Sequence, residues 1–192
     1  MPVLLWGATM GHRRDRDVAL LPVLAVASLL TTVEPAEGQR RPYARKASIP
    51  EEVGNDPYLR IEITSVLNAT VPSRLEVEAP PYPDARIIRS KPARSFSSRS
   101  GDTYETLPVV VLATTDAPEQ VIEFYQRVLT GWSRRQIGDT FHFWLGEDDY
   151  DPLAKSGKIT PSIQIIRAGD IRLVPQAQTE IHVRYLPGGG FR

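Results

Sequence analysis

The order of elements is decided by residues 107–145, which read LPVVVLATTDAPEQVIEFYQRVLTGWSRRQIGDTFHFWL. The apolar run from Val109 to Ala113 is typical of a central strand that is covered on both faces. Apolar residues at helical spacing follow it and predict one amphipathic helix, which ends at Gly131. After Trp132 the apolar residues alternate with polar ones, and this pattern predicts two strands joined by a turn.

The start of this helix carries its own signal. Asp116 is placed to accept hydrogen bonds from the first free backbone N–H groups, and Glu119, three residues later, completes a capping box. Pro118 is tolerated in the first turn, where its missing N–H costs no helical hydrogen bond. We therefore predict that Asp116 caps the helix.

Alternation predicts further strands on both sides of this stretch. Leu59, Ile61 and Ile63 alternate with polar residues, and the same pattern recurs in residues 159–167 and 179–186. A short strand opens at Ile87 and Ile88, and the Ser- and Arg-rich segment 89–101 is expected to form a mobile loop. Because strands precede and follow a single long helix, the predicted fold is α+β: an antiparallel sheet with one main helix packed on one face.

The N-terminal segment resembles a secretory signal peptide. Arginines between positions 13 and 16 precede an uncharged apolar run, residues 18–33, and small residues at Ala36 and Gly38 fit a cut before Gln39. The run is shorter than the roughly 20 apolar residues that a spanning helix needs. We expect a periplasmic or secreted protein with no membrane span after cleavage. An uncleaved anchor or a buried core helix stays open as the alternative.

Composition and charge exclude several kinds of site and indicate how the chain is organised. There is no cysteine, which excludes disulfides, thiolate metal sites and a cysteine nucleophile, and the formal net charge is zero, so no global field attracts nucleic acid. The predicted organisation is a signal peptide at 1–38 with its true start at Met10, a basic and polar linker at 39–56, one α+β domain at 57–187 and a flexible tail at 188–192.

One face of the predicted sheet carries most of the candidate functional residues. If Phe141 and Ile181 face the helix, alternation places polar and aromatic side chains on the opposite, open face. Should the strands that hold His142 and His182 be neighbours, their imidazoles and Glu180 form a candidate site for a transition metal. Otherwise the face is a groove for an unidentified ligand or protein partner. Its candidate ligand-binding residues are His142, Trp144, Gln164, Glu180, His182 and Arg184.

No motif for catalysis or for a cofactor is present in the sequence. No serine lies in a G-x-S-x-G turn, and the glycines at 188–190 precede no helix, so neither a nucleophile elbow nor a phosphate loop is predicted. The basic segment from Arg86 to Arg99 contains one aromatic residue, Phe96, which serves base stacking poorly. We therefore interpret it as a solvated loop and predict no catalytic residue, no cofactor and no nucleic acid partner.

Two short motifs support a family resemblance. Tyr82-Pro83-Asp84-Ala85 and, on the helix, Phe124-Tyr125 with Leu129 resemble a small domain of exported bacterial proteins of unknown function. That domain pairs a Y-P-x-A turn with a helix bearing F-Y-x-x-x-L, and the resemblance covers about residues 81–185. It implies a secreted α+β module without a known activity.

The same helix also looks like the first helix of the vicinal oxygen chelate (glyoxalase-like) family, whose module runs strand, helix, three strands. This resemblance implies metal ligands on several strands and a site between two modules, so that this chain would act as a dimer. The strand at 109–114 contains neither His nor Glu, which departs from that pattern.

Two functions therefore compete. The first is a non-enzymatic extracytoplasmic binding or interaction module, and the second is a metal-dependent glyoxalase-like enzyme.

Overall fold

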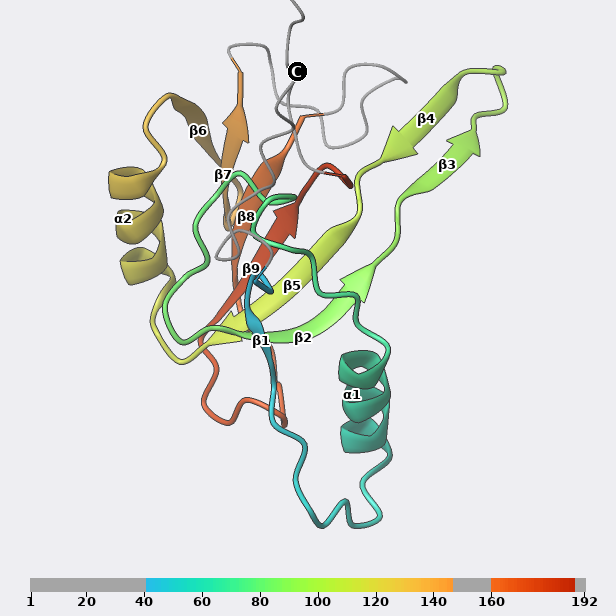
Figure 1. Ribbon diagram of the computed structural model, residues 1–192, viewed down its shortest axis with the longest axis vertical. Coiled ribbons are helices and arrows are strands. Elements are labelled where there is room, and N and C mark those ends of the chain that lie inside the picture. The colour runs from blue at the N-terminus through green and yellow to red at the C-terminus, as the bar shows by residue number, and fades with distance from the viewer. Residues whose placement is uncertain (1–40, 147–159, 189–192) are drawn as a thin grey trace, which may run out of the picture. The chain divides into compact units, whose positions relative to one another are not determined.

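The computed structural model describes residues 41–146 and 160–188, and all statements on structure concern these residues (Figure 1). The helices are α1 (Pro57–Leu67) and α2 (Pro118–Val128). The strands are β1 (Arg45–Lys46), β2 (Arg86–Lys91), β3 (Arg94–Ser97), β4 (Thr103–Thr106), β5 (Val109–Thr114), β6 (Trp132–Ile137), β7 (Thr140–Leu145), β8 (Ser162–Arg167) and β9 (Thr179–Arg184).

The main sheet has its most buried strand where the sequence predicted it. Its strand order is β1-β2-β5-β9-β8-β7-β6, and all six residues of β5 are buried. Every pairing is antiparallel except that of β1 with β2, so the sheet is mixed. Strands β3 and β4 form a separate two-stranded ribbon. The fold is α+β, with a predominant sheet and a smaller share of helix.

Helix α2 covers one face of the sheet, as predicted. Val121 and Tyr125 are fully buried and pack in one core with Leu112, Phe143 and Ile181 of the strands. Within each strand, every second side chain points to this face, because the side-chain direction alternates along a strand.

The predicted cap of α2 is wrong by one residue. The N-cap is Ala117, whose N–H donates to the side-chain oxygen of Gln120 at 3.1 Å. Asp116 instead accepts a hydrogen bond from the hydroxyl of Tyr82 at 2.8 Å, and its backbone oxygen accepts one from Thr179 at 2.6 Å. Asp116 thus connects the start of α2 with Tyr82 and with Thr179 of β9. A local capping pattern does not reveal such long-range contacts.

The second helix corrects two predictions, a strand at residues 59–63 and a single main helix. Helix α1 begins after Asp56, which accepts hydrogen bonds from the first free N–H groups, and Pro57 occupies its first position. Ile63 and Val66 are buried, whereas Ile61 is 63% exposed. The apolar residues therefore follow the helical period toward the sheet, and α1 packs on the face opposite α2, beside β2.

The predicted linker and the predicted basic loop both contain regular structure. Tyr43 is buried in the core of the α2 face, its N–H donates to Pro72 at 2.8 Å, and β1 pairs with β2. The domain therefore begins before residue 57. In the segment 89–101, β2 continues to Lys91 and strand β3 follows, so this segment is not simply a loop.

Two predicted features lie outside the described residues: the signal peptide and the tail beyond Gly188. Neither helix of the described ranges has the length and apolar character needed to cross a bilayer.

Candidate functional site

The register of the strands places the predicted site residues on one face of the sheet, opposite α2. His142 pairs with Gln164, and Gln164 pairs with His182, so these three form a row across β7, β8 and β9. In the next row Trp144 and Arg184 flank Ser162. Alternation groups them within each strand, and because the residues between them are buried against α2, the three strands present these groups on the same side of the sheet.

The two histidines are not on neighbouring strands, so the condition for a shared metal site is not met. Strand β8 separates them, and two strand spacings correspond to about 10 Å. Within residues 41–146 and 160–188, no three His, Cys, Asp or Glu side chains come close enough together to hold a metal ion. Instead, the side chain of His182 forms a hydrogen bond with Glu180, and the side chain of His142 contacts that of Gln164.

The β7 end of this face is buried, contrary to the expectation of an open surface. His142 and Trp144 are both buried, and the Gln164 side-chain nitrogen lies 3.3 Å from Nδ1 of His142. Burial, together with the charges of Arg184 and Arg135, lowers the pKa of His142 below its usual 6.5. The imidazole is therefore neutral at pH 7.

A charged network lies toward β2 on the same face. The Glu180 carboxylate accepts a hydrogen bond from Arg89 at 2.6 Å and lies 2.8 Å from Nε2 of His182. The hydrogen bond with His182 lowers the pKa of Glu180, against the effect of burial, and Arg89 and Lys91 lower it further. Glu180 is consequently ionised at pH 7, and its negative charge is compensated by its neighbours.

A cleft of about 530 Å³ adjoins this network, where the base of the β3–β4 ribbon meets β5 and β9. Lys91, Arg94 and Arg184 bring three cationic side chains to it. Leu107 and Val109 contribute an apolar part of its lining. Gln164 and His182 also line the cleft. Together with Arg184 they are three of the six predicted site residues, so half of the predicted set meets here.

Sequence reasoning missed Lys91 and Arg94 as site residues. Both lie in the segment predicted to be a loop, and no local pattern connects them with β9. Pairing of β2 with β5 brings Lys91 to the cleft, and pairing of β3 with β4 sets Arg94 beside Thr106 there.

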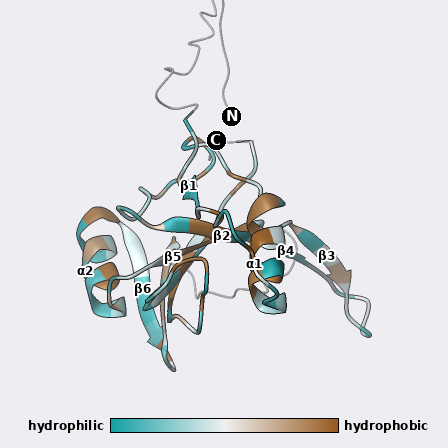
Figure 2. Cartoon of the chain, turned by 90° about the horizontal axis from the view of Figure 1, so that it is seen from below, coloured by the Kyte–Doolittle hydropathy of each residue, from teal (hydrophilic) through white to brown (hydrophobic). Residues whose placement is uncertain are grey.

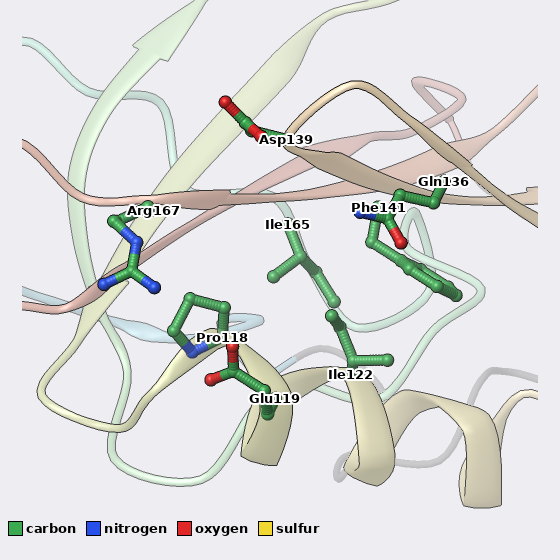
Figure 3. Close-up of a pocket in the computed structure, with 8 residues that line it drawn as sticks. All are labelled: Pro118, Glu119, Ile122, Gln136, Asp139, Phe141, Ile165 and Arg167. Carbon is green, nitrogen blue, oxygen red and sulfur yellow. The ribbon is translucent and has the colours of Figure 1, made fainter.

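A second hollow of about 400 Å³ lies on the other face, between α2 and strands β6 to β8 (Figure 3). Its lining includes the apolar side chains of Ile122, Phe141 and Ile165. Glu119 on α2 and Asp139 in the β6–β7 turn supply carboxylates, and Arg167 supplies the guanidinium. With two anionic groups and one cationic group, this hollow is less suited to an anion than the cleft.

The two hollows thus differ in charge, and of these two it is the cleft that contains residues of the predicted site. Comparisons of the chain with models of known protein families, with curated proteins and with solved structures found no match.

Proposed function

We propose that this protein is a non-enzymatic extracytoplasmic binding module that holds an anionic ligand in the cleft beside β9. The observation that carries the proposal is the convergence of Lys91, Arg94 and Arg184 on one hollow. Glu180, the carboxylate of β9 on this face, is shared by Arg89, His182 and Lys91 and therefore offsets only part of this positive charge.

The chemistry of the cleft suits a carboxylate or phosphate group. Arg and Lys form charge-assisted hydrogen bonds to such anions, which are stronger than hydrogen bonds between neutral groups. Gln164 adds an amide, and Leu107 and Val109 provide an apolar surface for the ligand's carbon skeleton. The extracytoplasmic part of the proposal is supported by the basic, apolar and small-residue pattern of residues 13–38.

The first test is calorimetric titration of citrate, a small polyanion, into the protein recovered from the extracytoplasmic fraction of a bacterium. We expect Lys91→Gln and Arg94→Gln each to weaken binding by about 10- to 150-fold, in line with loss of a hydrogen bond to a charged group. Arg134→Gln on β6 is the matched control, because it removes a cation from an exposed position three strands away from β9. Equal losses in all three variants would contradict a localised site.

The same preparation tests the glyoxalase-like alternative. Native mass spectrometry that finds a transition metal in stoichiometric amount, together with its loss in His142→Ala or His182→Ala, would favour the enzyme over the binding module.

A further inference from the structure

We infer that the ligand of the cleft is an acidic polysaccharide whose chain continues from the cleft onto the β3–β4 ribbon. This inference rests on the proposed anion-binding function and names the class of its ligand.

The ribbon is an unusual appendage to this sheet. Strands β3 and β4 pair with each other and with no strand of the main sheet in the described residues, and they lead away from it (Figures 1 and 2). All four residues of β3 are exposed. An isolated two-stranded ribbon is at best marginally stable in water. A ligand that lies along the ribbon would give it the contacts that the main sheet does not provide.

One face of the ribbon continues the lining of the cleft. Arg94 pairs with Thr106, and both line the cleft. Two residues further along each strand, on the same face, Phe96 pairs with Tyr104. Their rings are stacked, with centroids 5.6 Å apart and planes 15° from parallel. The aromatic pair is therefore about 7 Å along the strand from the cationic lining.

The aromatic pair is accessible. Phe96 is 45% exposed although its side chain is large and apolar. The ring of Tyr104 packs against one face of the Phe96 ring, so the two rings form a single platform rather than a series of platforms. A sequence-tolerant nucleic acid site normally stacks successive bases on several aromatic side chains. One platform beside a cationic cleft fits one sugar ring and the neighbouring acidic units better.

An acidic polysaccharide presents both kinds of group that this surface recognises. Each sugar ring has a face of C–H groups, which packs against the electron-rich face of an aromatic ring. The carboxylates of adjoining units are complementary to Lys91 and Arg94. The repeat of ring and anion along one chain allows both contacts to form at once, which increases the effective concentration of the second contact.

The test is titration of a hexauronate oligosaccharide into the full chain and into Phe96→Ser. We expect the variant to bind the hexauronate about tenfold more weakly, as for loss of one stacking contact, and to bind citrate as the unchanged protein does. Ile137→Ser is the matched control, because Ile137 on β6 is also 45% exposed. Phe96→Tyr keeps the ring and is expected to retain the affinity, which separates loss of stacking from loss of folding.

The outcomes separate this inference from the proposed function. Citrate binding that depends on Lys91, combined with hexauronate binding that is unaffected by Phe96→Ser, would overturn the polysaccharide and leave the anion site standing. Absence of binding for citrate and hexauronate alike would overturn both. Tighter binding of a single-stranded DNA hexamer than of the hexauronate, or equal binding of a neutral maltohexaose, would also overturn the acidic polysaccharide.

Discussion

Two ionisable residues on the same sheet face have opposite reasons for their shifted pKa values. His142 is buried near two arginines, so its charged form is disfavoured and its pKa is lowered. Glu180 is bound by His182 and Arg89, so its charged form is favoured and its pKa is also lowered. Burial is the largest cause for His142, and the hydrogen bond with His182 is the largest cause for Glu180. Arg184 and Arg89, which lower these pKa values further, come from strands that are distant in sequence.

The lowered pKa of His142 predicts a loss of stability in mild acid. In the unfolded chain this imidazole takes up a proton as the pH falls through about 6.5, whereas in the folded chain it stays neutral until a lower pH. The unfolded state therefore binds more protons in this window, and the free energy of unfolding decreases as the pH falls from about 7.5 to about 5.5.

Substitution of His142→Gln is expected to remove this contribution to the pH dependence. Urea unfolding at the two ends of this pH window measures it: the unchanged protein should lose more stability between them than the variant does. Parallel losses in both proteins would show that His142 titrates normally in the folded state.

At the scale of the element, helix α1 shows why a local pattern can mislead. Residues 59, 61 and 63 satisfy the two-residue period of a strand, but residues 59, 63 and 66 satisfy a helical period equally well. The Asp-Pro pair at 56–57 is a helix-start signal that distinguishes the two, since Asp caps and Pro favours the first position. Packing of Ile63 and Val66 against the sheet then stabilises the helix.

Helix α1 is also tied to the segment between β8 and β9 through one carboxylate. Glu62 accepts hydrogen bonds from the backbone N–H groups of Arg172, at 3.3 Å, and of Leu173, at 2.9 Å. Arg172 in turn forms an ion pair with Asp56 at 2.8 Å. These contacts join the N-terminal part of the helix to a loop 110 residues later in the chain.

We expect Glu62→Ala to lower the free energy of unfolding by about 1–3 kcal/mol, because two partly buried N–H groups lose their acceptor. Hydrogen exchange should show faster exchange of the Leu173 amide in the variant. Glu123→Ala is a suitable control, since it removes a carboxylate from α2, the helix on the opposite face of the sheet. Unchanged exchange at Leu173 would contradict the role assigned to Glu62.

For the whole molecule, the N-terminal boundary of the fold is set by contacts that precede the predicted domain. Tyr43 lies in the same core as Tyr125, and Ala47 lies in the core beneath α1. Residues that resemble a linker in composition thus contribute to both faces of the sheet. The predicted cut before Gln39 leaves all of these residues in the chain.

Two truncations test this boundary. A chain that lacks residues 1–38 is expected to match the full chain in its free energy of unfolding. A chain that lacks residues 1–47 loses Tyr43 and β1 and should be destabilised by at least about 3 kcal/mol, the cost of removing a large buried aromatic residue. Urea unfolding followed by tryptophan fluorescence measures both. Equal midpoints for the two truncated chains would show that the fold begins after residue 47.

The amino-acid sequence by itself determined the central strand β5, the position of helix α2 and the strands β6 to β9, because local signals mark them: a continuous apolar run in β5, a helical period in α2, and alternation or a turn in the strands that follow. It also placed His142, Gln164 and His182 on one face, because alternation in each strand puts them opposite the apolar residues that face the helix. Only the tertiary structure decided which of these residues meet. Strand β8 separates the two histidines, β2 and the ribbon bring Lys91 and Arg94 to the cleft, and α1 covers part of the second face. The physical reason is that pairing and packing are non-local: they depend on the burial and hydrogen bonding of the whole chain, which no short window contains.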